Sequence, residues 1–143
     1  MCANFKPPPL ETLLAWGFSI AEGAQYKPEV YPGQVAPIVT SADSNRVHLA
    51  CFGLVPHWAQ PNLARMTYNA RSETVATKPS FRSAWRNAQL AAIPAQCFYE
   101  PNYESGKAVR HAIKRKDGQP SGLLDCGSDA WMTPDRRECH SRY

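Results

Sequence analysis

The stretch LAAIPAQCFYE (residues 90–100) decides the fold, because it places two short apolar runs side by side with a proline between them. Its aliphatic and aromatic side chains favour extended structure, and Pro94 cannot donate a ladder hydrogen bond. We therefore expect two short strands, broken at Pro94. The second strand ends at Glu100, immediately before Pro101.

Similar patterns lie on both sides of this stretch. Residues 35–40 and 46–55 predict strands, the latter by alternation of apolar and polar side chains. Residues 107–120 alternate in the same way and end in Asp117-Gly118, a strong hairpin turn signal. These segments predict a largely antiparallel sheet.

Two segments have the spacing of short helices. Residues 7–17 begin with prolines and end at a glycine, and residues 78–89 carry a proline in the first turn. In the second segment we expect Phe81, Ala84 and Trp85 to face inward. With 13 prolines in 143 residues, many short strands and loops are favoured over a helical bundle.

Composition indicates one globular domain that can bury a core, with 43% hydrophobic and 20% charged residues. The net charge of +4 permits an anionic partner such as nucleic acid without requiring one. No apolar run approaches the ~20 residues of a membrane span, and no signal peptide pattern opens the chain, so we expect a cytoplasmic protein. Five scattered cysteines without a C-x-x-C pair indicate neither a metal site nor a disulfide framework, and no cofactor is expected.

The character of the sequence changes where the partner of the hairpin strand is due. Residues 123–143, LLDCGSDAWMTPDRRECHSRY, show no alternation and few β-branched residues. We therefore expect no returning strand, and we divide the chain into residues 1–121 and a divergent tail, residues 122–143.

The chain starts with Met1-Cys2, and removal of Met1 would leave a cysteine with a free α-amine. An α-amine has a pKa near ~8, so a useful fraction is neutral and nucleophilic at physiological pH. Together with the thiol it can condense with an aldehyde and close to a thiazolidine, or the thiol can act as a hydrolytic nucleophile. The plain alternative is a solvated chain end.

Three further stretches carry polar residues in strand or turn contexts. In residues 67–82, Asn69 could orient a reacting group and Arg71 could bind a phosphate, or they could be a turn cap and a surface charge. Glu100, flanked by aromatic residues, could be an acid/base group with a raised pKa, or a solvent-facing strand end. Trp58, in a loop bracketed by prolines, could stack on a base or fold over the core.

In this order and spacing, Met-Cys, GLVPHWA, NARSET with KPSFR, and IPAQCFYE resemble the SRAP (SOS response-associated peptidase) family. The resemblance covers residues 1–121. It implies an α+β fold, built as a barrel-like, mainly antiparallel sheet with short helices, here incomplete at the C-terminus.

The resemblance also implies a reaction in the response to DNA damage. Family members remove Met1 autocatalytically and link the new N-terminal cysteine to the aldehyde of an abasic site in single-stranded DNA. By motif, Cys2 would be the nucleophile, Asn69 would position the amine or the opened sugar, and Glu100 would be the acid/base group. Arg71 would bind phosphate, and Trp58 would stack on a base.

The sequence departs from the family pattern at several points. Ala3-Asn4 replaces the usual Gly-Arg, and Pro101 replaces a tryptophan. The family's later histidine segment, H-x-R-M-P, has no counterpart: His140 lies in an unrelated context, and His111 faces the apolar side of a predicted strand. We expect no catalytic role for either histidine.

The tail suggests a frameshift. Back-translating residues 122–129 with allowed codons and shifting two bases yields Pro-Ala-Gly-Leu-Trp-Glu-Arg, which contains the family's AGLWE segment. We hypothesise a frameshift near residues 120–122 in a prophage-like or repair gene.

Two other functions therefore stay open. The chain could be an inactive, truncated product whose exposed sheet edge drives association, or a thiol peptidase acting on polypeptides. Scattered arginines, among them Arg82, favour single-stranded DNA as the partner. We expect a monomer that associates with the nucleoid.

Overall fold

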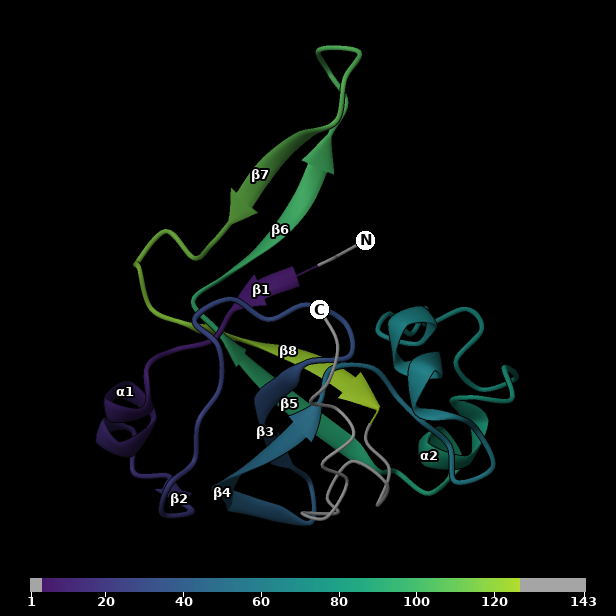
Figure 1. The fold of residues 1–143 in the computed structure, drawn as a ribbon, viewed down its shortest axis with the longest axis horizontal. Coiled ribbons are helices and arrows are strands. Elements are labelled where there is room, and N and C mark those ends of the chain that lie inside the picture. Colours follow the sequence, from purple (N-terminus) through teal and green to yellow (C-terminus); the bar gives the residue numbers. More distant parts are fainter. Residues whose placement is uncertain (1–3, 127–143) are drawn as a thin grey trace.

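The computed structural model describes residues 4–126, which form two sheets with short helices at their sides (Figure 1). Cys2 and most of the predicted tail lie outside these residues. The elements, in chain order, are β1 (Asn4–Lys6), α1 (Leu10–Ala15), β2 (Ser19–Ile20), β3 (Val35–Thr40), β4 (Asp43–Cys51), the 3-10 helix η1 (Pro61–Met66), α2 (Arg82–Arg86), β5 (Leu90–Ala95), β6 (Cys97–Asn102), β7 (Val109–Ile113) and β8 (Ser121–Cys126).

The predicted α+β class with a mainly antiparallel sheet is confirmed. One sheet has the strand order β1-β6-β7 and the other β2-β4-β3-β5-β8, and only the β2–β4 pair is parallel. Over residues 4–126 the strands do not close into a barrel. In Figure 1 the β6–β7 hairpin projects away from the five-stranded sheet, and α2 lies beside that sheet.

The two sheets are joined at Gln96, not at Pro94 as the sequence predicted. Pro94 lies within β5, opposite Gly122 of β8. β3 pairs with β5 only as far as Ala92. Pro94 lies two positions farther along β5, where no N–H is needed to donate to β3, so a proline is tolerated there. The Gln96 N–H donates to the Lys6 carbonyl oxygen at 2.8 Å, which brings β1 to the junction of the sheets.

A strand, β8, does form where the sequence predicted none, but Asp117-Gly118 does not close a hairpin, because β7 pairs with β6 and not with β8. β8 pairs along six positions with β5 and does not return to β7. Within the described chain β7 pairs with β6 alone, and all five of its residues are exposed. The alternation in β7 therefore does not correspond to a buried face.

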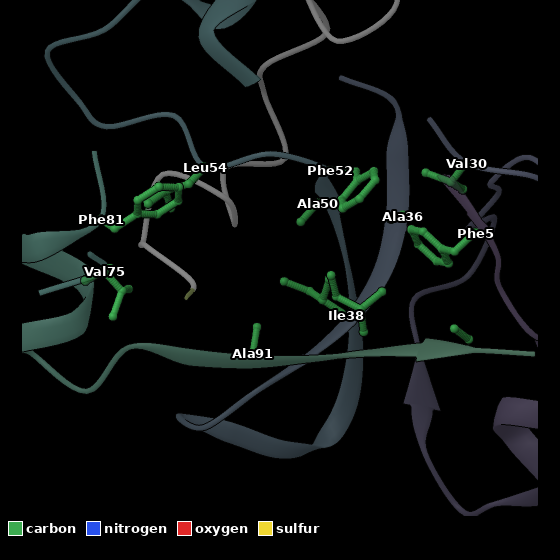
Figure 2. Close-up of a cluster of buried hydrophobic side chains, with 13 residues drawn as sticks. Phe5, Val30, Ala36, Ile38, Ala50, Phe52, Leu54, Val75, Phe81 and Ala91 are labelled. Atoms are coloured by element: carbon green, nitrogen blue, oxygen red, sulfur yellow. The ribbon is translucent and has the colours of Figure 1, made fainter. Parts of the chain in front are cut away.

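The hydrophobic core lies between β3, β4 and β5 and the segment that joins β4 to β5. Figure 2 shows Phe5 at one end of the core and Phe81 at the other, with Ile38 between them. Phe81, the residue before α2, and Ala84 within α2 point inward as predicted, but Trp85 is 48% exposed. The helix is only five residues long, which is too short for three inward positions.

The helices in the described chain are all short. None of them has the length and apolar character needed to cross a bilayer.

Candidate functional site

Strand β1, near the start of the chain, lies at the junction between the two sheets. Asn4 lies opposite Tyr99 and Phe5 opposite Phe98 in the antiparallel pair with β6. Phe5 is completely buried, and its backbone exchanges hydrogen bonds of 3.1 and 2.9 Å with Val30. Cys2 precedes Asn4 by two residues in the sequence and lies outside the described residues.

Glu100 lies on β6 near this point. It shares one face of the strand with Phe98, which packs against the core, and it is half-buried. Its position opposite His111 on β7 puts the two side chains on the same face of the pair. Glu100 follows Tyr99 directly, so its backbone is one residue from the partner of Asn4.

The segment that carries Asn69 is fixed by a buried hydroxyl. Thr67 is 4% exposed, and its hydroxyl donates to the carbonyl oxygens of Leu54 at 2.6 Å and Leu63 at 2.9 Å. The Leu54 N–H donates to the Thr67 carbonyl oxygen at 3.1 Å. These bonds hold residues 67–69 against the chain that leaves β4.

Close packing at Gly53 makes this arrangement possible. Gly53 has a φ of +124°, and a Cβ atom there would lie 2.0 Å from the carbonyl oxygen of Ala64. A side chain at this position would force η1 away from the end of β4. The glycine of the GLVPHWA motif is therefore required by backbone contact.

Three aromatic rings connect the segment of Asn69 to β1. The rings of Phe5 and Phe52 are 5.2 Å apart, and those of Phe52 and Tyr68 are 5.9 Å apart, both edge to face. Tyr68 immediately precedes Asn69, just as Phe5 lies three residues after Cys2. The packed rings thus tie the segment of Asn69 to β1.

Arg71, Trp58 and Arg82 lie on exposed parts of the segment between β4 and β5. Arg71 begins a turn in which its carbonyl oxygen accepts the N–H of buried Val75 at 2.8 Å. Trp58 is 59% exposed, and Arg82 is an exposed residue at the start of α2. The aromatic contacts above include none of these three residues.

Sequence reasoning missed a polar cluster on the opposite face of β1. The carboxylate of Glu29 accepts hydrogen bonds from the Asn4 side-chain amide, from the Tyr31 hydroxyl at 2.8 Å and from the Arg110 guanidinium. Arg110 also lies over the ring of Tyr99, 3.4 Å from its centroid. These residues come from distant parts of the chain, and no local pattern connects them.

Two tyrosines near this cluster have shifted acidities. The hydrogen bond to the Glu29 carboxylate raises the pKa of the Tyr31 phenol. The pKa of Tyr99 is also raised, chiefly by its hydrogen bond with the side chain of Cys97. The Tyr31 hydroxyl is the donor in its hydrogen bond to the Glu29 carboxylate.

Between residues 4 and 126, no group of three or more histidine, cysteine, aspartate or glutamate residues could hold a metal ion.

Comparison with known proteins identifies relatives of the chain. A sequence profile of the family described as SOS response associated peptidase (SRAP) matches residues 1–141. The abasic site processing proteins YoqW and YoaM of Bacillus subtilis (strain 168) are 36% and 35% identical to it over 80 residues. That match covers 53% of this chain and 35% of each relative, so only about a third of the length of these relatives is matched.

Two crystal structures have a similar fold. A protein of Bordetella bronchiseptica superposes with a TM-score of 0.72 at 28% identity, over 86% of this chain and 62% of the other. A protein of Bacteroides thetaiotaomicron superposes with a TM-score of 0.70 at 22% identity, over 86% and 58%. The second likeness concerns the fold alone.

Proposed function

The chain belongs to the SOS response associated peptidase (SRAP) family, and we propose that it acts on abasic sites in DNA. In the finer form of the proposal, it binds single-stranded DNA and links covalently to the abasic site through Cys2 after Met1 has been removed. The name of the curated relatives, abasic site processing protein, supports the substrate.

One structural observation carries the proposal. The strand that begins two residues after Cys2 is paired with the strand of Glu100, and Phe5 contacts the aromatic rings that lead to Asn69. This pairing and these ring contacts support the proposal that a nucleophile, an acid/base group and an orienting amide act together on one aldehyde.

The reaction balances without a cofactor. Hydrolysis of the Met1–Cys2 peptide bond consumes one water and releases methionine. The freed amine adds to the aldehyde carbon and a water leaves, which gives a Schiff base. The Cys2 sulfur then adds to the same carbon while the nitrogen takes up the thiol proton, so the thiazolidine forms with net loss of one water.

The roles of the residues follow from their positions. Glu100 would pass protons to and from the amine and the leaving water, and Asn69 would orient the amine or the opened sugar. Arg71 and Arg82 would bind phosphates, and exposed Trp58 would stack on a base. A substrate of this kind, DNA with abasic sites, would place the protein in the cytoplasm, with the nucleoid.

Incubation with labelled single-stranded DNA tests the proposal. We expect a denaturation-resistant adduct with DNA that contains an abasic site, no adduct with intact DNA, and no adduct with the Cys2→Ala variant. A folded protein that forms no abasic-specific adduct would exclude the proposal for this chain.

A second candidate is an inactive product that lacks part of the domain. The outer edge of β7, which has no strand partner within residues 4–126, favours it. This candidate predicts association or poor solubility, whereas the active protein should be a monomer with a single cooperative melting transition.

A further inference from the structure

Glu29 contacts β1, the first strand of the described chain, through the side chain of Asn4. We propose that Glu29 is a positioning residue, which holds β1 so that Cys2 is presented to its substrate; this rests on the proposed function of Cys2. Glu29 lies in the connection between β2 and β3, and its side chain is 27% exposed.

The first step of the argument is the shortness of β1. The strand has only three residues, and chain ends fray unless they are tied down. Phe5 is anchored on one face by the core and by the backbone hydrogen bonds with Val30. The pairing with β6 holds the backbone of all three residues, and a further contact on the opposite face would hold the side chain of Asn4, the first of them.

The second step is the anchor on the other face. Successive side chains of a strand point to opposite faces, so Asn4 points away from the core that holds Phe5. Asn4 is nevertheless 4% exposed, and its amide donates to the carboxylate of Glu29. Two consecutive residues, Asn4 and Phe5, are therefore fixed from opposite sides of β1.

The third step is the rigidity of Glu29 itself. Glu29 and Tyr31 flank Val30, the backbone partner of Phe5, and the Tyr31 hydroxyl donates to the same carboxylate. Arg110 reaches this carboxylate from β7 while it lies over Tyr99. A partly exposed ion pair contributes little alone, but donors from three segments restrict the carboxylate to one orientation.

Single-turnover adduct formation on abasic single-stranded DNA tests the proposal. For Glu29→Ala we expect the rate at saturating DNA to fall about tenfold or more, because small displacements of a reacting group cost large factors in rate. The half-saturating DNA concentration should stay within about twofold of wild type, since Glu29 contacts the protein and not the DNA.

Two variants separate positioning from a general loss of structure. Glu29→Gln keeps an oxygen that can accept from Asn4 and Tyr31, so we expect the rate to recover to within about threefold of wild type. Glu22→Ala removes an exposed carboxylate from the same connection and should behave as wild type. If Glu29→Ala does not fold, Asn4→Ala takes its place, and the same loss of rate is expected.

Three results would overturn the proposal. One is a folded Glu29→Ala, or Asn4→Ala in its place, that reacts at the wild-type rate. Another is a Glu29→Ala that changes only the half-saturating concentration, which would make Glu29 a DNA-binding determinant. The third is a Glu29→Gln variant that forms the adduct as slowly as Glu29→Ala does.

A second readout keeps this proposal separate from the proposed function. If the wild-type protein forms no adduct, the proposed function fails, and amide hydrogen exchange at Phe5 still tests the hold on β1. Its N–H donates to Val30, and exchange should accelerate about tenfold or more in Glu29→Ala but not in Glu22→Ala. Unchanged exchange would refute the positioning role.

Discussion

Phe5 of β1 and Phe52, the residue after β4, pack edge to face with ring centroids 5.2 Å apart and an interplanar angle of 86°. Both side chains are buried, and Phe52 also contacts Tyr68. This contact joins the strand nearest Cys2 to the segment of Asn69, so it serves both the core and the proposed site.

Removing the ring of Phe52 should destabilise the protein strongly. For Phe52→Ala we expect the free energy of unfolding to fall by about 3–5 kcal/mol, since a buried ring is replaced by a cavity. Tyr103→Ala, at a residue that is 65% exposed, is the matched control and should change it by less than about 0.5 kcal/mol. Urea denaturation measures both, and equal losses would contradict the role of Phe52.

Gly53 should tolerate no side chain. Because a Cβ atom would lie 2.0 Å from the Ala64 carbonyl oxygen, Gly53→Ala must displace backbone. We expect a loss of about 2 kcal/mol or more in the free energy of unfolding. Gly106→Ala also has a positive φ, 75°, but no atom lies within 4 Å of its Cβ, so it should cost about 1 kcal/mol. If Gly53→Ala lowers the free energy of unfolding no more than Gly106→Ala does, η1 can move to make room for a side chain, and the prediction is contradicted.

Glu100 should affect chemistry more than DNA binding. For Glu100→Gln we expect adduct formation to slow about 100-fold or more, because the amide cannot transfer protons. The affinity of Glu100→Gln for intact single-stranded DNA should equal that of the wild type. The control Glu104→Gln, at an exposed position in the β6–β7 connection, should form the adduct at the wild-type rate. Rapid adduct formation by Glu100→Gln would assign the proton transfer to another group.

Tyr26 should make stability depend on alkaline pH. Burial, assisted by the charge of Glu11, raises the pKa of Tyr26 to about 12, and its hydroxyl donates to the Pro8 carbonyl oxygen at 2.5 Å. An unfolded tyrosine has a pKa of about 10, so the folded state is favoured below pH ~10 and loses this contribution as the pH rises through the folded pKa.

Tyr26→Phe tests this dependence. In an absorbance titration, the wild type should contain a tyrosine that ionises near a pKa of about 12, and the variant should lack it. Stability of the variant should fall less steeply across that interval. Identical titrations of the two proteins would contradict the assignment.

Local patterns predicted most of the elements, because they depend on neighbours in sequence. The strand at residues 35–40 was predicted with its observed bounds, and both helices were predicted in place but too long. The sequence predicts a break at Pro94 because a proline has no N–H, but whether that N–H is needed depends on how far β3 pairs with β5, which is tertiary information.

The remaining differences also come from long-range contacts. The pairing of β8 with β5 depends on which strand has an open edge in the folded sheet, and the composition of residues 121–126 does not reveal it. The cluster around Glu29 joins residues as far apart as Asn4 and Arg110, and neither motif nor periodicity links them. Asn69, Arg71, Glu100, Trp58, Arg82 and Cys2 were proposed from motifs, and their roles stay predictions.

The hypothesis of a frameshift near residues 120–122 also stays a prediction. The coding DNA decides it: a shifted frame that reads AGLWE after the hairpin would support the hypothesis, and its absence would refute it.

Intact mass spectrometry of the protein before and after incubation with abasic single-stranded DNA tests the central claim most directly. The account predicts a protein that lacks Met1, and an adduct whose mass is the sum of this protein and the DNA minus one water. A folded protein that retains Met1 and forms no adduct, or an adduct that persists in Cys2→Ala, would contradict it.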